Sequence, residues 1–594
     1  MSENIYARVR LAVLDVVRGV VPGVPEEALT RVEVSPAKEA GHGDMATNAA
    51  MVIAKAARQS PKVLAEAIAA GLSGGVDVEH AVAAGPGFVN LTLRVPALLA
   101  VVGNVLRAGE SYGDSGAGDR VAVNVEYVSA NPTGPMHIGH CRGAVVGDAL
   151  ANLLGKAGFA VTKEYYVNDA GAQVGALGWA AYWRYLQALG SPLTEEEFAA
   201  ATPTGLQYKG EYLVPVGEAL AVEFGDGLAG PGLSVGEPAQ WFETVRDFAI
   251  ERMMASIRAD LDALGVSFDV FTSERALVAR GEADRVVERM TAAGLVYEGV
   301  LEPPKGKMPD DWEPREQTLF RATQFGDDVD RALRKSDGSN TYFANDIANH
   351  ADKMARGAEL MIDVWGADHG GYVSRMKSAV KALAGDGGQR LEIVLCQIVH
   401  VLRGGVPVRM SKRAGTYVTL ADLLEWVGRD AVRFTMLMRK SDAQMEFDLD
   451  MAVAQTRENP VFYVQYAHAR CRSVLRAAIE AGHDVSPAAL AEATLESVGA
   501  EAELGLVRRL ASWPRTVEGA ALAQEPHRIA FYLYDLAGDF HMLWNRGRDD
   551  STLRFLQADH PAETRARLAL VEATATTIRS GLAILGVAPV EEMR

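Results

Sequence analysis

The spacing of hydrophobic and polar residues changes along the chain, and its first part predicts a small α+β domain over residues 1–115. Apolar positions at helical spacing fill residues 5–21 and 45–70. A short apolar run at residues 87–93 predicts a strand. The stretch at residues 109–119 is rich in Gly, Ser and Asp, which is typical of a linker.

After this linker the pattern becomes strand, loop, helix and strand. Residues 121–128 form a strong β run, residues 141–158 favour a helix, and residues 159–167 form a second β run. This order is the βαβ unit of a doubly wound parallel sheet. Further strand candidates, with helical stretches between them, are residues 268–271, 360–365 and 391–401.

The remaining part of the chain contains an insertion and a helical end. Gly- and Pro-rich pieces interrupt the helical pattern over residues 181–240, which indicates an insertion carried by the sheet domain. After residue 450 the β runs stop and helical periodicity continues. We therefore expect an α/β protein. It would have a doubly wound, Rossmann-like domain over residues 116–450, an N-terminal α+β domain, and an all-helical domain over residues 451–594.

The composition indicates a globular protein and narrows the choice of partner only weakly. Hydrophobic residues make up 48% and charged residues 23% of 594 residues, which excludes a disordered or collagen-like chain. The net charge of −18 argues weakly against a nucleic-acid ligand, although a local basic groove stays compatible with it. No stretch of the sequence approaches the roughly 20 uninterrupted apolar residues that a membrane helix needs, and the sequence begins without a secretory signal, so we expect a cytoplasmic protein with no membrane contact. Cys141, Cys396 and Cys471 are too far apart for a CxxC zinc site.

The tetrapeptide His137-Ile138-Gly139-His140 stands between a predicted strand and a predicted helix. A doubly wound sheet binds ligands at this end of its strands, and a helix N-terminus offers N–H groups to phosphate. Gly139 would let a ligand approach the backbone, and the two imidazoles can stabilise charge that develops on an α-phosphate. A structural histidine pair and a metal site are the alternatives, but no suitable third ligand is nearby in the sequence.

A second candidate phosphate site is the basic loop that contains Arg409, Met410, Lys412 and Arg413. A mobile loop with these cations between glycines can close on a triphosphate and neutralise the leaving pyrophosphate. On its own it would be interpreted as a solvent-exposed basic hairpin. With the HIGH tetrapeptide upstream, the two elements resemble the two signatures of class I aminoacyl-tRNA synthetases, in the same order.

Over nearly its whole length the chain resembles arginyl-tRNA synthetases of the bacterial type. The blocks that carry the resemblance are VEYVSANPTGPMHIGHCRG, YVNDAGAQV, DVWGADHGGYVSRM, RMSKRAGTYVTLADLL and NPVFYVQYAHAR. The segments GHGDMATNAAM and GPGFVNLTL are similar to the additional, tRNA-contacting N-terminal domain of this family, and the C-terminal helices are similar to its anticodon-binding domain. Arg409 departs from the family signature, which has lysine there. The charge is kept, but arginine and lysine are not equivalent.

The resemblance implies ATP-dependent activation of L-arginine to arginyl-adenylate and transfer of arginine to tRNA(Arg), with release of pyrophosphate and AMP. It also implies Mg²⁺ with the ATP, no zinc, no separate editing domain, and an activation step that requires bound tRNA. We expect a monomer.

The site residues follow from matching this sequence to the family motifs position by position. The expected catalytic residues are His137, His140 and Lys412. The expected ATP-binding residues are His137, Gly139, His140, Gly366, Asp368, Met410 and Lys412. The residues expected to bind arginine are Glu126, Asn131, Tyr342, Asp346 and His369. The candidates for tRNA contact are Tyr463, Tyr466, Arg470 and Trp544.

Tyr342 and Asp346 lie four residues apart, and therefore on one face if their segment is helical. Asp346 can accept paired N–H bonds from a planar guanidinium, which lysine cannot supply. Without the resemblance, the two residues would be interpreted as a helix cap and a packed tyrosine.

Three other functions compete with this interpretation. Among other class I synthetases, the cysteinyl and methionyl types often carry Cys/His zinc sites, and the leucyl, isoleucyl and valyl types carry an editing insert much larger than residues 181–240. A catalytically silent relative that acts as an RNA-binding module would not need His137, His140 and Lys412. A small-molecule nucleotidyltransferase would share the HxGH turn but would not need the helical domain.

Overall fold

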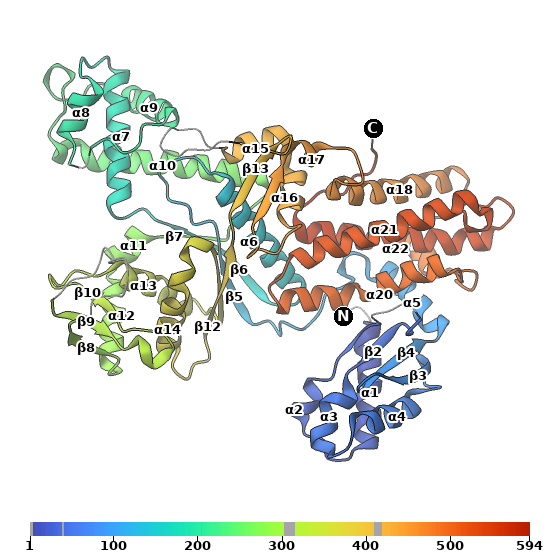
Figure 1. Cartoon of the computed structure of the whole chain (residues 1–594). Coiled ribbons are helices and arrows are strands. Elements are labelled where there is room, and N and C mark those ends of the chain that lie inside the picture. Colours follow the sequence, from blue (N-terminus) through green and yellow to red (C-terminus); the bar gives the residue numbers. More distant parts are fainter. Residues whose placement is uncertain (1–3, 38–40, 204, 302–314, 409–417, 594) are drawn as a thin grey trace. The chain divides into compact units, whose positions relative to one another are not determined.

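The structure is a computed structural model that describes residues 4–37, 41–203, 205–301, 315–408 and 418–593. Its internal contacts divide the chain into two units (Figure 1). Unit 1 comprises Met1–Asp119, Lys156–Gly158 and Ala454–Arg594, and unit 2 comprises Arg120–Gly155 and Phe159–Val453.

Unit 2 is built on a five-stranded parallel sheet with the order β12-β11-β5-β6-β7. Its strands are β5 (Ala122–Glu126), β6 (Ala160–Val167), β7 (Val270–Ser273), β11 (Leu360–Gly366) and β12 (Arg390–Cys396). The chain runs outward from β5 through β6 and β7, and then returns to the other side of β5 as β11 and β12. This reversal at β5 is the switch point at which doubly wound sheets bind ligands. The predicted doubly wound fold is confirmed.

Three helices adjoin the central strands in the chain and carry many of the polar residues of the site. Helix α6 (Ile138–Lys156) follows β5, α13 (Tyr342–Ala355) precedes β11, and α14 (Val373–Ala384) connects β11 to β12. Strands β5 and β11 are buried along most of their length, as expected of parallel strands that are covered on both faces. Polar groups can therefore meet solvent or a ligand mainly at the carboxyl ends of these strands.

Residues 391–401, which we predict as one strand, form parts of two strands in different sheets. Strand β12 ends at Cys396, and β13 (Val399–Arg403) pairs in parallel with β15 (Met445–Asp448) and antiparallel with β14 (Val406–Pro407). The break lies at Gln397, whose N–H bonds to the carbonyl of Ser441 and whose carbonyl accepts from Arg142. The apolar pattern continues across the break because both strands are partly buried.

Two further predictions of secondary structure are wrong in detail. Residues 45–70, predicted as one helix, contain strand β2 (Met45–Thr47) and helices α3 (Ala49–Ala57) and α4 (Pro61–Leu72). The helices are separate because Arg58 takes a left-handed conformation (φ 52°) and Pro61 cannot continue a helix from before it.

Between β7 and β11, where we predict helical stretches, the chain also forms an antiparallel sheet. Its strands are β8 (Val296–Gly299), β9 (Gln317–Phe320) and β10 (Arg331–Arg334).

The predicted insertion is part of a helical subdomain of unit 2 that extends beyond residues 181–240 on both sides. Its helices are α7 (Ala172–Ala188), α8 (Glu195–Ala201), α9 (Val214–Phe224) and α10 (Pro238–Leu264). Aromatic side chains form its core, and the rings of Tyr182 and Trp241 stack at 3.5 Å between centroids.

Unit 1 combines a small sheet with a helical bundle. The sheet has the order β1-β2-β4-β3, in which β1 (Val34–Pro36) and β4 (Phe88–Leu93) flank β2, and β3 (Val78–Ala84) pairs with β4. Helix α1 (Ile5–Val20) accompanies this sheet. The bundle consists of α18 (Pro460–Glu480), α20 (Glu501–Leu522), α21 (His527–Asp549) and α22 (Pro561–Leu585). In the described part of the chain no strand follows β15, which agrees with the predicted helical end.

Helix α5 (Val95–Ala108), from the N-terminal part of the chain, packs against α20 and α22 of the bundle. Helix α22 is long and apolar enough to cross a membrane, but 89% of its most apolar window is buried inside the protein. This burial makes α22 the central helix of the bundle.

Candidate active site

The turn between β5 and α6 holds two histidines in defined orientations. The imidazoles of His137 and His140 stack with 3.8 Å between centroids and 17° between planes. The backbone N–H of Gly139 donates to Nδ1 of His137 (3.1 Å), and the N–H of His137 donates to Nδ1 of His140 (3.3 Å). A neutral imidazole that accepts at Nδ1 carries its proton on Nε2. Both rings can therefore present an Nε2–H donor at the N-terminus of α6, as a phosphate site requires.

Gly139 is fitted to this arrangement. A Cβ atom at position 139 would lie 3.0 Å from Cε1 and 3.1 Å from Nδ1 of His137, so a larger residue would push the ring out of place. The HIGH turn also contacts the start of α15 (Leu420–Val427): His137 forms a β-bridge with Thr419, and the N–H of Leu420 donates to the carbonyl of Met136 (2.9 Å). The predicted loop residues Arg409, Met410 and Lys412 lie outside the described residues.

Glu126, the last residue of β5, lies in a row of carboxylates across the sheet. Its register partners are Asp363 on β11 and Glu164 on β6. Oε1 of Glu126 accepts from the hydroxyl of Ser129 (3.1 Å), and Oε2 accepts from Nδ2 of Asn349 (3.0 Å). A buried lysine from α13, Lys353, also contacts Oε2 at 2.6 Å. Glu126 is thus held at the switch point by three donors.

Asp346 lies one turn into α13 and is half-buried. Its Oδ2 accepts from the hydroxyl of Tyr372 (2.7 Å), and its backbone carbonyl accepts from Nδ1 of His350 (2.8 Å). Burial raises the pKa of Asp346 to about 6. The Tyr372 bond and the charge of His350 oppose this rise, and Glu126 and Asp363 add to it. A carboxylate in this environment is stabilised when a cationic ligand binds beside it.

Tyr342, the first residue of α13, is exposed to solvent, whereas Asp346 is half-buried. The side chain of Tyr342 is 66% exposed, and Thr341 caps the helix by accepting the N–H of Ala344. The alternative interpretation of these residues as a cap and a packed tyrosine is therefore wrong. Tyr342 and Asp346 share one helix face, as expected from their spacing, and Tyr342 stands at its exposed end.

The other predicted site residues of unit 2 lie at the end of β11 or on the loops that follow β5 and β11. Nδ2 of Asn131 donates to Oε1 of Gln173 (2.7 Å). Gly366 ends β11, and the exposed side chains of Asp368 and His369 follow it with 3.8 Å between Oδ2 and Nε2. These residues belong to the carboxyl-end side of the sheet, where the HIGH turn also lies.

Several polar residues of this region were not predicted. Glu274 begins α11 (Glu274–Ala279), and burial together with the charge of Asp346 raises its pKa. The others are Asn349, His350, Lys353, Asp363 and Tyr372. On α13 the residues 346, 349, 350 and 353 recur at helical spacing, which is a signal present in the sequence. Asp363, Tyr372 and Glu274 meet them only through the fold.

In unit 1 the structure brings together three of the four residues predicted to contact tRNA. The guanidinium of Arg470 lies over the rings of Tyr466 (4.1 Å) and Trp544 (5.0 Å). It donates to the Tyr466 hydroxyl (2.9 Å) and to Nδ1 of His541 (3.0 Å). Burial lowers the pKa of His541 to about 4, so this ring is neutral at physiological pH and can accept the bond. Tyr463, the fourth residue, contacts the ring of His541 at 4.6 Å.

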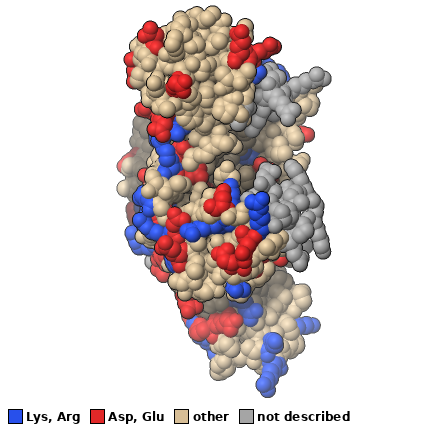
Figure 2. Space-filling model, turned by 90° about the vertical axis from the view of Figure 1, so that its left-hand side faces the viewer, with Lys and Arg blue, Asp and Glu red and all other residues tan. Residues whose placement is uncertain are grey.

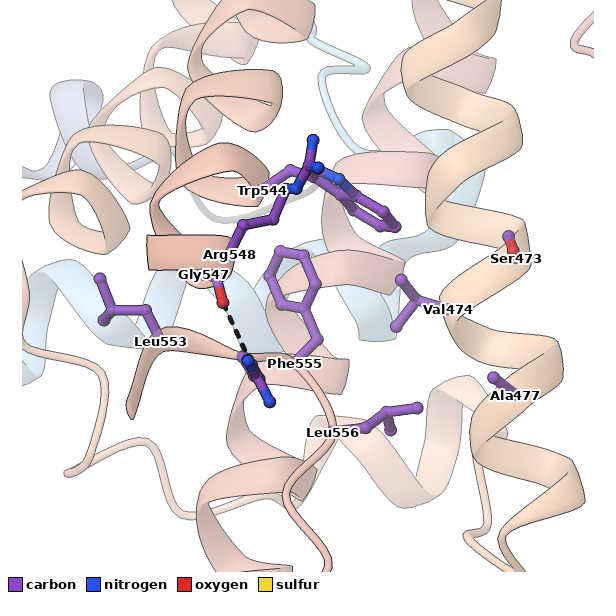
Figure 3. Close-up of a pocket in the computed structure, with 10 residues that line it drawn as sticks. Ser473, Val474, Ala477, Trp544, Gly547, Arg548, Leu553, Phe555 and Leu556 are labelled. Carbon is purple, nitrogen blue, oxygen red and sulfur yellow. Dashed lines mark hydrogen bonds between the residues drawn. The ribbon is translucent and has the colours of Figure 1, made fainter. Parts of the chain in front are cut away.

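Trp544 also lines a cavity of about 680 Å³ between α18, α21 and the segment that follows α21 (Figure 3). The rings of Trp544 and Phe555 lie 6.1 Å apart, and Val474 of α18 is on the opposite side. Arg548 and Arg554 also line the cavity. An apolar, partly aromatic cavity with arginines is suited to a flat ring that carries negative charge nearby.

The net charge of −18 is not spread as a uniform acidic surface. Figure 2 shows one face on which basic and acidic side chains lie next to one another, and over its described part neither sign forms a continuous field. Among the described residues, no group of three or more His, Cys, Asp or Glu side chains is arranged to hold a metal ion. Cys141, Cys396 and Cys471 are buried thiols.

Family models match three parts of the chain. Residues 6–93 match the arginyl tRNA synthetase N terminal domain, residues 101–188 match the catalytic domain of class I (R) tRNA synthetases, and residues 464–593 match the DALR anticodon binding domain. Among solved structures, arginyl-tRNA synthetase from Thermus thermophilus has a TM-score of 0.73 at 22% identity, with 99% of this chain and 100% of that chain covered. The enzyme from Plasmodium falciparum has a TM-score of 0.71 at 16% identity, with both chains covered fully. These two likenesses show the fold.

Two arginine–tRNA ligases match the sequence over all or nearly all of its length. The chain is 60% identical to the arginine–tRNA ligase of Gluconobacter oxydans, an alignment that covers 100% of this chain and 98% of the relative. It is 57% identical to the arginine–tRNA ligase of Ruegeria pomeroyi, with 95% of this chain and 94% of the relative covered. The chain therefore belongs to the arginyl-tRNA synthetase family.

Proposed function

We propose that the protein joins L-arginine to tRNA(Arg) at the expense of ATP, through an arginyl-adenylate, with release of pyrophosphate and AMP. Two features that lie together at the switch point of the sheet support this proposal. One is the histidine turn at the start of α6, which suits phosphate, and the other is the cluster of carboxylates on β5 and α13. The first suits a nucleotide and the second suits a cationic amino acid.

His137 and His140 act on the α-phosphate of ATP. Their Nε2–H groups and the N-terminus of α6 provide donors for the oxygens that gain charge when the arginine carboxylate attacks the phosphorus and pyrophosphate leaves. We assign Gly139, Gly366 and Asp368 to ATP binding, and also the loop residues Met410 and Lys412, by the family motif. The phosphates of ATP would carry Mg²⁺ as their counter-ion.

Arginine binds between α13 and the end of β5. The carboxylates of Asp346 and Glu274 together form an acidic binding site for the guanidinium. Burial and the charges of neighbouring carboxylates raise the pKa of both groups. A planar guanidinium can bond to two oxygens at once, whereas an ammonium offers a point charge, so this place favours arginine over lysine. Glu126, Asn131, Tyr342 and His369 complete the proposed arginine site.

The tRNA is held by the helical bundle and by the N-terminal domain. Arg470, Tyr466, Trp544 and Tyr463 provide the cationic and aromatic surface on which unstacked anticodon bases can pack. We propose the domain limits 1–115, 116–450 and 451–594. We also propose a monomer in the cytoplasm.

The test is a charging assay with purified protein, ATP, Mg²⁺, total tRNA and each labelled amino acid in turn. We expect arginine alone to become acid-precipitable, and only with ATP present. Charging of another amino acid would overturn the substrate assignment. A protein that binds tRNA but charges none of the amino acids would be a silent relative that acts as an RNA-binding module.

A further inference from the structure

Lys353 is a completely buried lysine at the centre of the carboxylate row. Its side chain is 0% exposed, and Nζ lies 2.6 Å from Oε2 of Glu126 and 2.9 Å from Oδ1 of Asp363. Burial disfavours its charge, but the charges of Asp363, Glu126 and Glu164, together with the bond to Glu126, outweigh burial and hold the pKa of Lys353 above its ordinary value. An ammonium that is taken fully out of water is costly, and this cost is offset only by such close partners.

The donors to Glu126 are unequally divided between its two oxygens. Oε2 accepts from both Lys353 and Asn349, whereas Oε1 accepts from the hydroxyl of Ser129. A carboxylate oxygen has two acceptor positions. Oε2 is therefore fully used inside the protein, and Oε1 retains one acceptor position for a ligand.

We propose that Lys353 is a positioning residue of the arginine site, which holds Glu126 by Oε2 so that Oε1 receives one cationic N–H group of the substrate. This inference rests on the proposed function, because it takes arginine as the substrate. Lys353 acts through Glu126 and does not itself touch the substrate.

The same lysine also separates two negative charges. Glu126 and Asp363 are register partners on neighbouring strands, and Lys353 is placed between their carboxylates. Without its ammonium the two like charges would face each other in a buried place, where both cannot remain ionised at low cost. A Glu126 that turns away or takes up a proton would attract arginine less strongly.

Asp363 is held from its other side as well. Nε2 of His350 lies 2.8 Å from its Oδ2, and both ring nitrogens of His350 face oxygen acceptors. Burial lowers the pKa of His350, but the charge of Asp363 and the hydrogen bonds to Asp363 and to the Asp346 carbonyl together outweigh burial and raise this pKa. Helix α13 is thus anchored to β11 through Asp363 even where Lys353 is replaced, which makes a folded Lys353 variant attainable.

The experiment compares full-length Lys353→Met with the wild type and with Lys377→Met, in the charging assay. Lys377 forms a half-exposed ion pair with Glu392 (2.7 Å) in the same unit and controls for the loss of any ion pair. We expect the KM for arginine to rise about tenfold or more in Lys353→Met, because one partner of a buried charge pair is lost. The KM for ATP should change less than about twofold, and Lys377→Met should behave like the wild type.

A double-mutant cycle with Glu126→Gln separates positioning from a purely structural role. If Lys353 acts through Glu126, Lys353→Met will raise the KM for arginine much less in the Glu126→Gln background than in the wild type. An equal rise in both backgrounds, or an unchanged KM in Lys353→Met, would overturn the inference.

Lys353→Met/Asp363→Asn removes the second carboxylate and serves if the single variant does not fold. We expect it to fold with the raised KM for arginine, and a wild-type KM there would also overturn the inference. A wild-type protein that fails to charge arginine would overturn the proposed function instead.

Discussion

The hydroxyl of Tyr372 donates to Oδ2 of Asp346 across 2.7 Å, and this bond fixes one oxygen of the carboxylate that we assign to arginine recognition. Tyr372 ends the turn after β11 and Asp346 lies in α13, which precedes β11, so the bond connects the segments on either side of this strand in the chain. The remaining acceptor positions of Asp346 are then set in direction before a substrate arrives. Such preorganisation lowers the entropic cost of ordering the site when the substrate binds.

Asp346→Asn should raise the KM for arginine by about a hundredfold while the KM for ATP changes little. The substitution keeps the size but places an amide donor against a donor-only guanidinium, and a buried charged partner is lost. Arginine-dependent charging of tRNA at varied arginine and varied ATP measures both constants. Equal losses for the two substrates would mean that Asp346 supports the fold of the whole site.

The same substitution should leave the melting temperature unchanged or raise it at pH 7.5. The folded-state pKa of Asp346, about 6, lies above the ordinary value of an aspartate, so the carboxyl favours the folded protein only in its protonated form. That contribution is lost as the pH rises through about 6. Asparagine does not carry the buried charge. A marked fall in the melting temperature of Asp346→Asn would contradict this account.

The KM for arginine should rise as the pH falls below about 6, by about tenfold per pH unit for one proton. Burial raises the pKa of Asp346 into this range, and a protonated Asp346 no longer attracts a guanidinium. The rise should be absent in Asp346→Asn. If it persists in that variant, another group, such as Glu274 or His350, controls the pH dependence.

His140→Ala should slow arginine activation by about a hundredfold to a thousandfold, the range typical for the loss of one donor to a developing charge. The KM for arginine should stay near its wild-type value, because His140 addresses phosphate charge and not the amino acid. Pyrophosphate exchange in the presence of tRNA measures this step. Near-wild-type exchange would remove His140 from the catalytic set.

The sequence predicts those parts of the site that depend on local order. The HIGH turn follows the loop after β5 and begins α6, as the sequence predicts, because a strong β run, a Gly- and Pro-containing loop and a helical pattern follow one another in this order. The switch from β12 to β13 was not predicted, since both strands are apolar and only the distant partners, β11 and β15, distinguish them. Lys353 was missed for a similar reason: a single lysine in a helix is ordinarily exposed, and Asp363 reaches it only in the folded sheet.

Arg142→Met should destabilise unit 2 by about 3 kcal/mol or more, because three partly buried carbonyls lose a charged, buried donor. Arg142 is 0% exposed and donates to the carbonyls of Gln397 (2.8 Å), Ala443 (2.8 Å) and Lys440 (3.0 Å). It thereby connects α6, which carries the HIGH turn, to the segments that flank β13 and β15. Thermal unfolding measures the change, and Arg403→Met, at an exposed arginine of β13, is the control. Equal melting temperatures for the two variants would contradict this role.

Trp544→Ala should raise the KM for tRNA by about tenfold to a hundredfold and leave the KM for arginine unchanged. The expected size is that of one lost stacking contact with a base, which is about 1–3 kcal/mol. Trp544 is half-buried beside the guanidinium of Arg470 and lines the cavity of Figure 3, so its ring is both held in place and accessible to a ligand.

The matched control for Trp544→Ala is Phe531→Ala, which removes another aromatic ring from α21. Phe531 is 43% exposed and does not line the cavity. A nonspecific effect of removing an aromatic residue from α21 would weaken tRNA binding in both variants. A specific role of the cavity would weaken it only in Trp544→Ala. If both variants keep the wild-type KM for tRNA, Trp544 is a packing residue of the bundle. The anticodon contact would then be assigned to Tyr466 and Arg470.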